Sequence, residues 1–269
     1  MEMALKIAAT YRDSLAAGLP CWKKAVVPAV LLAVWQAVTA AGLVKPILLP
    51  SPLQVLEAFQ AMAVSGELAA HLGASIVRVL EGFALAAVLG VGLGLALGIF
   101  PLLFSLADGI IQLMRPIPPI AWLPLAILWF GIEEGSKVFI ITLGAFFPIF
   151  VNVLDGVRQT DHKFLELARV LEVPKGKFVA KVVIPGALPF IAAGLRIGLG
   201  YAWMCVVAAE LSAGMTGIGY MLTDARALAQ TDRVLVGMLA IGVVGKAMDG
   251  ALRVLEKRVV RWKTAFTGE

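Results

Sequence analysis

Long apolar runs separated by short polar loops are the feature of this sequence that most limits how it can fold. An α-helix of roughly 20 apolar residues is enough to cross the hydrocarbon core of a bilayer. Of the 269 residues, 60% belong to the hydrophobic set and 15% are charged, whereas soluble domains are about 45–50% apolar. The sequence therefore predicts an all-α membrane protein that crosses the bilayer several times.

About six transmembrane helices are predicted, each bounded by polar or proline-rich residues. They cover residues 25–44, 71–100, 102–130, 136–155, 187–211 and 233–252. The third is predicted to be a kinked span, interrupted by Pro116, Pro118, Pro119 and Pro124. A broken helix at membrane depth needs protein or a polar cavity around it, so this span should lie against the rest of the fold.

The positive charges are distributed unequally between the two sides of this topology. Sixteen of the 23 Lys and Arg residues fall in the first 24 residues, the 101–116 turn, the 156–185 segment and the C-terminal tail. The loops of the opposite side hold five, which are Lys45, Arg78, Lys137, Arg226 and Arg233. Because positive charge accumulates on the cytoplasmic side, both termini and the 156–185 segment are predicted to face the cytoplasm. The same rule accounts for the net charge of +5 without a nucleic-acid partner.

Metal, disulfide and catalytic sites are not suggested by the residues that would form them. Cys21 and Cys205 are far apart and have no ligand spacing around them, and His71 and His162 fall on opposite sides of the predicted topology. The sequence also lacks a G-x-x-x-x-G-K-[ST] phosphate loop, so we expect no ATPase site in this chain. A membrane-embedded enzyme would need catalytic groups gathered at a cavity, and this pattern offers no such group.

The polar segment 156–185, between the fourth and fifth spans, is longer than a simple connection requires. Ordering it costs conformational entropy that some contact must offset. Asp161 can cap a helix that begins at His162, and Pro174 is predicted to end it. Its apolar face is predicted from helical spacing and consists of Phe164, Leu165, Ala168 and Leu171.

A second short helix is predicted from Gly176 to Val183, with Pro185 as its end. The two arms would form a helical hairpin close to the membrane. Two interpretations of the hairpin remain open. An amphipathic helix of this kind docks in the groove of a soluble partner. Alternatively it lies on anionic lipid headgroups, which Lys175, Lys177 and Lys181 would attract.

Gly90, Gly94 and Gly98 recur at four-residue intervals in the second span. This spacing places them on one face of the helix, where small residues let another helix approach closely in lipid. The alternative is a helix that is merely flexible. We predict that the three glycines mark a helix-packing face.

Ionisable residues in or near apolar spans are costly and need a partner, a polar path or access to the interface. Four such residues are present: Arg196, Glu210, Lys246 and Asp249. Lys246 and Asp249 lie three positions apart and are expected to neutralise each other. Arg196 is the candidate for attracting an anionic substrate along a translocation path. Glu210 is expected to pair with Arg226 or Arg233, or to border the outer entrance of that path.

The 166–185 segment resembles the EAA loop of ABC-importer permeases. Glu166, Leu167 and Ala168 take the places of Glu-Ala-Ala, and Glu172 takes the place of the glycine that follows four positions later. Leu167 and Glu172 depart from the family pattern. The second departure bears on the turn, because a residue with a Cβ tolerates positive φ poorly.

The resemblance extends over residues 45–255 and points to the nitrate/sulfonate/taurine branch of these permeases. It is carried by LPSPLQV at 49–55, RPIPPIAWLPLAILWFG at 115–131 and GLRIGLGYAWMCVVAAEL at 194–211. It implies a type I ABC importer permease fold, with a cytoplasmic N-terminal tail at 1–24, a first transmembrane helix at 25–44, a permease core at 45–255 and a cytoplasmic basic tail at 256–269.

The resemblance also implies partners and roles. Such a permease forms a homodimer in the bacterial inner membrane, docks two cytoplasmic ATPases that bind ATP and Mg, and receives substrate from an extracytoplasmic binding protein. The coupling helix 161–173 would present Glu166, Leu167, Ala168, Arg169, Leu171 and Glu172 to the ATPase. Arg196 and Glu210 would border the translocation path of a small anion such as a sulfonate, taurine, nitrate or bicarbonate.

An ion-coupled secondary transporter is the alternative function. Such transporters are built from internal repeats with ionisable groups at broken-helix midpoints. The sequence has no convincing internal duplication, which favours the importer permease.

Overall fold

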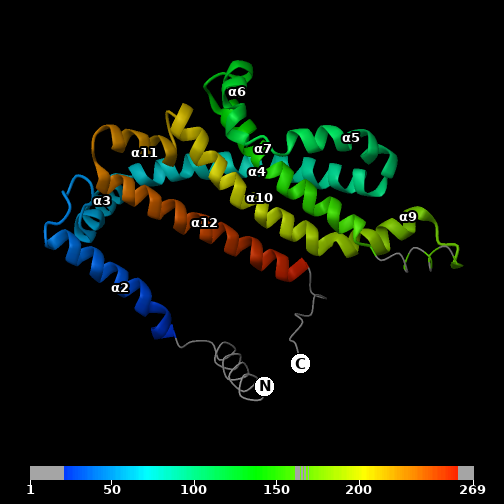
Figure 1. Cartoon of the computed structure of the whole chain (residues 1–269), viewed down its shortest axis with the longest axis horizontal. Helices are drawn as coiled ribbons and strands as arrows, with labels where there is room; N and C mark the ends of the chain where they lie inside the picture. Colours follow the sequence, from blue (N-terminus) through cyan, green and yellow to red (C-terminus); the bar gives the residue numbers. More distant parts are fainter. Residues whose placement is uncertain (1–20, 161–163, 165, 167, 169, 260–269) are drawn as a thin grey trace, which may run out of the picture.

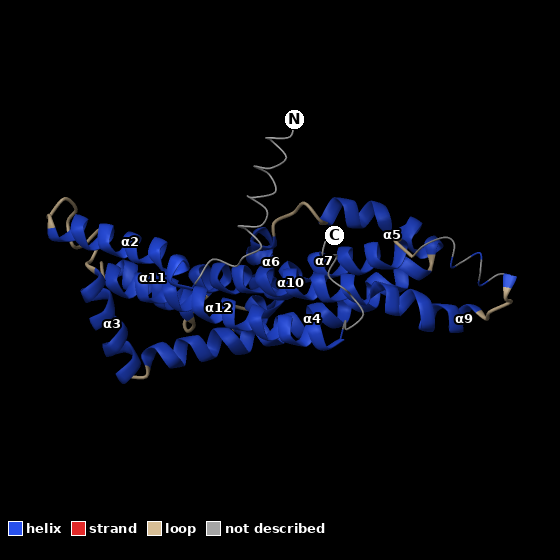
Figure 2. Cartoon of the chain, turned by 90° about the horizontal axis from the view of Figure 1, so that it is seen from below, coloured by secondary structure: helices blue, strands red, loops and turns tan. Residues whose placement is uncertain are grey.

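The computed structural model describes residues 21–160, 164, 166, 168 and 170–259, and this part of the chain is helical without a β-strand (Figures 1 and 2). The predicted all-α fold is therefore confirmed. The helices before the polar segment are α2 (Cys21–Ala40), α3 (Pro52–Val64), α4 (Glu67–Ile99), α5 (Pro101–Met114), η1 (Pro119–Trp122), α6 (Leu123–Phe130) and α7 (Glu134–Arg158). Those after it are α9 (Lys175–Phe178), η2 (Val179–Val183), α10 (Ile184–Ala213), α11 (Ile218–Ala227) and α12 (Thr231–Val259).

Four helical stretches are long and apolar enough to cross a membrane, and a bent pair raises the number to five. The four are Glu67–Ile99, Glu134–Arg158, Lys175–Ala213 and Thr231–Glu256. The predicted first span at 25–44 corresponds to α2, which has the same length but begins and ends four residues earlier, at Cys21 and Ala40. Helix α2 is not counted among the four or five, and Val26–Ala40 within it is a shorter apolar helix.

The bent pair is the predicted third span, and its two parts meet at 88°. The break lies between Arg115 and Pro118, where Pro116 and Pro118 cannot continue the hydrogen bonding of α5. Pro124 was also predicted to interrupt this span, but it does not contribute to the kink. It lies in the first turn of α6, where a missing N–H leaves no hydrogen bond unmade.

Helix α7 occupies the centre of the core and packs between α4 and α10 (Figure 1). Its buried face carries large aliphatic side chains such as Ile141, Ile149 and Val153. The helices on both sides meet these side chains with alanine and glycine. Because lipid is as apolar as the side chains themselves, such close packing is a main force that holds membrane helices together.

The second short helix predicted to stop at Pro185 is instead continuous with α10. The stretch Lys175–Ala213 runs through η2, a π-helical turn, directly into the membrane helix. The Ile184 N–H bonds to the Val179 carbonyl, five residues back. This wider turn immediately precedes Pro185, which has no N–H to donate. The chain therefore absorbs the proline by changing its hydrogen-bond register instead of ending the helix.

The two ends of the molecule's long axis are built differently. Helices α3 and α11 lie at one end and α9 lies at the other (Figures 1 and 2). At the α3 end, a second buried cluster joins α3, α11 and the start of α12 around Met62, Ile218 and Val236. At the α9 end, a small cluster of Val157, Val183 and Ala187 packs against the end of α4. The polar segment between α7 and α9 thus projects from a fixed base.

Candidate functional site

The resemblance directs attention first to the turn between α7 and α9. Its described residues are Phe164, Glu166, Ala168 and Val170–Val173, which we call the 164–173 turn. Val170 is helical, and the chain turns at Leu171 and Glu172. The Val173 N–H bonds to the Ala168 carbonyl at 2.9 Å, and Glu172 has a φ of 51°. A left-handed residue followed by such a six-to-one bond is a Schellman motif, the common way to end a helix.

This geometry explains the family spacing in physical terms. The Schellman motif places Ala168 three positions before the helix end and Glu172 at the left-handed position. Glycine adopts positive φ without steric cost, which is why a glycine in that place suits the motif. Here Glu172 adopts the conformation that a glycine would favour, so the departure from the pattern changes the side chain and keeps the turn.

The side chains of the 164–173 turn face away from the rest of the chain. Phe164, Val170 and Leu171 are 53%, 79% and 64% exposed. Glu166 and Glu172 are exposed and Ala168 is half-buried. The remaining residues of the predicted helix, including its cap Asp161, the apolar Leu165 and the predicted coupling residues Leu167 and Arg169, lie outside the described residues. The described part therefore presents an apolar surface with two carboxylates.

An ion cluster that is buried except at Glu134, whose side chain is 59% exposed, links the membrane helices near the α3 end. We call it the Arg78 cluster, and it consists of Ser75, Arg78, Glu134, Lys137 and Glu210. The Arg78 guanidinium donates through Nη1 to Glu210 at 2.7 Å and through Nη2 to Glu134 at 2.7 Å. Arg78 Nε also pairs with Glu134, and Lys137 Nζ lies 3.3 Å from the same carboxylate. Two positive and two negative side chains thus join α4, α7 and α10.

The Glu210 carboxylate is the centre of this cluster and is only 1% exposed. Besides Arg78, it accepts hydrogen bonds from Ser75 Oγ at 2.8 and 2.9 Å and from the Gly219 N–H at 2.9 Å. A buried carboxylate is tolerated when its lone pairs are bonded and its charge is compensated. Both conditions are met here. The prediction that Glu210 pairs with Arg226 or Arg233 is wrong. Glu210 pairs with Arg78, and Arg233 lies 3.3 Å from Glu67.

The same cluster fixes the loop between α10 and α11. Arg78 donates to the Thr216 carbonyl at 2.8 Å and to its hydroxyl at 2.6 Å. The Ile218 N–H bonds to Ser75 Oγ at 2.9 Å, and the Gly217 N–H bonds to His71 Nδ1 at 3.1 Å. Gly217 has a φ of 106°, which only glycine adopts readily. The loop is therefore held by side chains of α4 and not by a ladder of backbone bonds.

Sequence reasoning missed Ser75, Arg78, Glu134 and Lys137 as members of one site. Arg78 had been counted with the loop charges, yet it lies about three turns into α4 and its sequence neighbours Val77 and Val79 are apolar. The available signal was the presence of one arginine and one glutamate in two different apolar runs. Charges in lipid-embedded helices pair with one another, so Arg78 and Glu210 could have been matched on that ground.

A second ion cluster joins α10 and α12 in the half of α10 nearer α9. We call it the Asp249 cluster, and it contains Arg196, Asp249 and Arg253. The Asp249 carboxylate accepts from Arg196 Nε at 2.7 Å and from Arg253 Nε at 3.0 Å. The expected pairing of Asp249 with Lys246 is wrong, because the carboxylate is directed to α10 and to the next turn of α12. The Arg196 and Asp249 side chains are 37% and 35% exposed.

The predicted packing glycines lie along one line against α7. A Cβ at Gly90, Gly94 or Gly98 would come within 3.0 Å of Ile149, Val153 or Val157, respectively. Each glycine of α4 therefore meets the branched side chain one turn further along α7. Sequence reasoning did not single out the corresponding residues on the other side of α7. Gly194 and Gly198 of α10 meet Asn152 and Ile149 in the same way.

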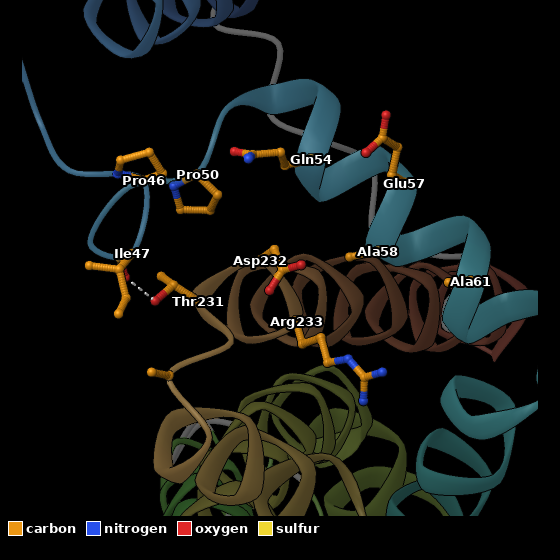
Figure 3. Close-up of a pocket in the computed structure, with 11 residues that line it drawn as sticks. Pro46, Ile47, Pro50, Gln54, Glu57, Ala58, Ala61, Thr231, Asp232 and Arg233 are labelled. Carbon is orange, nitrogen blue, oxygen red and sulfur yellow. Dashed lines mark hydrogen bonds between the residues drawn. The ribbon is translucent and has the colours of Figure 1, made fainter. Parts of the chain in front are cut away.

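A polar cavity of about 450 Å³ opens at the α3 end (Figure 3). It is bounded by the loop before α3, by α3 itself and by the start of α12, with Gln54, Glu57, Asp232 and Arg233 among its polar residues. The Thr231 hydroxyl donates to the Ile47 carbonyl at 2.6 Å and closes one side. Within the described part of the chain, no group of three or more His, Cys, Asp or Glu residues is placed to hold a metal ion.

Comparison with known proteins identifies the family to which the chain belongs. Residues 86–261 match the family of binding-protein-dependent transport system inner membrane components. The chain belongs to this family. Within the family it falls in the sulfonate/taurine/nitrate branch of ABC importer permeases, as the motifs predicted.

Three relatives place the permease in that branch. The aliphatic sulfonates transport permease protein SsuC of Bacillus subtilis is 41% identical over 92% of this chain and 90% of the relative. The taurine transport system permease protein TauC of Escherichia coli is 39% identical over 87% of both chains. The nitrate import permease protein NrtB of Synechocystis is 35% identical over 88% of this chain and 89% of the relative.

A solved structure supports the fold. The permease resembles a chain of the MetNI methionine ABC transporter in its inward-facing form, with a TM-score of 0.56 over 71% of this chain and 93% of that chain. The sequence identity is 20%, so the match concerns the fold alone. It supports the predicted type I ABC importer permease fold. The permease is accordingly an inner-membrane transport subunit whose family works with a binding protein.

Proposed function

We propose that this permease forms the translocation path of an ATP-driven importer for a small anion. An aliphatic sulfonate, taurine, nitrate or bicarbonate is the expected substrate class, and the names of SsuC, TauC and NrtB support all but the last. The observation that carries the proposal is the exposed 164–173 turn at one end of the molecule. An exposed apolar surface marks an interaction site, and the two carboxylates beside it favour a soluble protein over anionic lipid.

In this proposal a separate soluble ATPase binds ATP and Mg and receives the helix 161–173. The described contact residues are Glu166, Ala168, Leu171 and Glu172, and the sequence adds Leu167 and Arg169. The turn lies between the end of α7 and the start of the α9–α10 helix. Both helices enter the core directly, so a displacement of the turn would be transmitted to two membrane helices together.

The complete importer would contain two copies of the permease, two ATPases and an extracytoplasmic binding protein. The α9 end and both termini would face the cytoplasm, because the basic segments gather there. The α3 end, with its polar cavity, would face the binding protein. Helix α5 has no buried residue in the single chain, which leaves its apolar surface for lipid or for the second copy.

Arg196 is the proposed residue of the translocation path. It keeps more than a third of its side chain exposed while its charge is only partly compensated by Asp249, which Arg253 shares. An accessible cation within a membrane helix favours an anionic solute. Glu210 is not proposed for the path, because its carboxylate is enclosed by Ser75, Arg78 and the backbone of Gly219.

The test is uptake into vesicles that contain the permease, its ATPase and its binding protein. We expect uptake of a radiolabelled sulfonate or taurine that stops without ATP and is unaffected by collapse of ion gradients. Replacing the half-buried Ala168 by arginine should abolish ATPase assembly and uptake while the permease stays in the membrane. Normal assembly of the Ala168→Arg variant, or uptake driven by an ion gradient without the ATPase, would contradict the proposal.

A further inference from the structure

Glu172 occupies a position that disfavours it in two independent ways. Its φ of 51° is a left-handed conformation in which a Cβ is strained and glycine is not. It also ends a helix, where the macrodipole disfavours a negative charge and favours a positive one. Of the described residues outside glycine, only Glu172 and Ala229 have a positive φ. A glutamate in this place is therefore locally unfavourable both as a side chain and as a charge.

The described part of the chain does not offset this cost. Glu172 is exposed, and its carboxylate forms no ion pair or hydrogen bond with any described residue. Residues that break local rules without an internal compensation are expected at functional sites, where the compensation comes from a partner.

The surroundings of Glu172 separate two kinds of partner. Val170 and Leu171, immediately before it, are 79% and 64% exposed, and Glu166 adds a second exposed carboxylate. An anionic membrane surface repels carboxylates and attracts the lysines of the following arm, Lys175, Lys177 and Lys181. The turn thus divides into an acidic, apolar tip suited to a protein and a basic arm suited to headgroups.

We propose that Glu172 is a specificity-determining contact of the coupling turn. Its carboxylate forms an ion pair with an arginine or lysine at the rim of the ATPase groove that receives Val170 and Leu171. The pair offsets the backbone strain and the unfavourable helix-end charge only when the ATPase is bound. This inference rests on the proposed function, because it names how the same turn recognises its ATPase.

The recognition differs from that of a turn with glycine in this position. Glycine would relieve the strain but would present no charge, so an ATPase without the basic group would fit it equally well. A carboxylate favours the ATPase that carries the matching cation and disfavours one that carries an acid there, as electrostatic complementarity does at interfaces generally. The choice of glutamate would therefore help this permease to select its own ATPase.

The experiment measures the affinity of the purified ATPase for the detergent-solubilised permease, together with the thermal midpoint of the permease alone. Glu172→Gly should raise the midpoint by about 2–4 °C, because strain is removed, and weaken ATPase binding about tenfold. Glu172→Gln keeps the Cβ and should weaken binding by a similar factor with little change in the midpoint. Glu172→Lys should weaken binding by a further factor of about ten, through repulsion of the basic group.

Salt dependence and a matched control separate the ion pair from other effects. Binding by the unchanged permease should weaken as NaCl rises, and the Glu172→Gln variant should lose most of that dependence. Glu57→Gln, an exposed carboxylate at the α3 end, should leave ATPase binding unchanged. The inference is overturned if Glu172→Gly and Glu172→Gln bind the ATPase as tightly as the unchanged permease. In that case loss of binding in Ala168→Arg would still support docking through the turn, whereas tight binding by all three variants would reject the proposed function as well.

Discussion

The Arg78 cluster and the Asp249 cluster both pair arginine with a carboxylate and both include a residue of α10, but their central pairs differ in burial. Arg78 and Glu210 keep 4% and 0% of their side chains exposed, whereas Arg196 and Asp249 keep 37% and 35%. The first cluster is balanced, with two positive and two negative groups. The second has two arginines for one carboxylate. The buried charges of the Arg78 cluster therefore have a structural role, whereas those of the Asp249 cluster remain accessible.

The difference follows from what each cluster connects. The Arg78 cluster connects three membrane helices and the loop before α11, so Arg78 and Glu210 are each fixed by several contacts. The Asp249 cluster joins only α10 and α12, and one of its bonds stays within α12. A charge held on many sides cannot move toward a substrate. A charge held on one side can exchange its partner for an anion that passes.

The largest expected effect is the loss of Arg78. The Arg78→Ala substitution would leave Glu210 buried without its cation, and breaking a buried pair in this way costs about 3–5 kcal/mol. We expect little folded protein in the membrane and a strongly lowered thermal midpoint in detergent. The double variant Arg78→Met with Glu210→Gln should recover part of the loss, because no charge is then left unpaired. If Arg78→Ala had the same thermal midpoint as Arg253→Ala, the two clusters would not differ in their contribution to stability.

A smaller effect is expected from the close contact between α4 and α7. At Gly94 an added Cβ would lie 2.8 Å from Val153, whereas at Gly92 nothing lies within 4 Å. The Gly94→Leu variant should force α4 away from α7 and cost about 1–3 kcal/mol, as overpacking does. Gly92→Leu is the matched control and should be nearly neutral. Thermal unfolding of the two variants measures the difference, and equal midpoints would show that α4 and α7 are not in close contact.

The smallest effect on stability, and the clearest effect on transport, is expected at the Asp249 cluster. Arg196→Ala should lower ATP-dependent uptake severalfold while the thermal midpoint stays close to that of the unchanged permease, because the pair is partly solvated. Asp249→Asn should alter the apparent KM for the anion, since it leaves Arg196 free. Initial uptake rates at several substrate concentrations distinguish the lowered uptake of Arg196→Ala from the altered KM of Asp249→Asn. Full uptake by Arg196→Ala would exclude it from the path.

Much of the fold could be predicted from local pattern. The membrane helices were recognised from apolar runs, and the break at Arg115–Pro118 followed from two prolines. The errors lie where local pattern is ambiguous. The first span was predicted four residues too late, at 25–44 instead of Cys21–Ala40, and Pro185 was expected to end a helix that a π-helical turn carries past it.

The charged sites were less predictable than the helices. Arg196 and Glu210 were recognised as costly residues, but three expected partners, Lys246, Arg226 and Arg233, were wrong. Spacing along one helix suggested Lys246 for Asp249, yet Arg196 on another helix is the partner. Glu172 was the opposite case. A family motif indicated that this position favours positive φ, and the structure has φ at 51° there.

The sequence by itself determined the class of this protein, the approximate extent of its helices and its family. These properties depend on the transfer energy of each residue and on local backbone chemistry, which act over a few positions. Only the tertiary structure decided which charges are buried together and which stay accessible. Arg78 and Glu210 are 132 positions apart, and their 2.7 Å contact exists only because α4 and α10 pack near each other. Pairing of this kind depends on the distance between helices and on side-chain direction, and a hydropathy pattern contains neither.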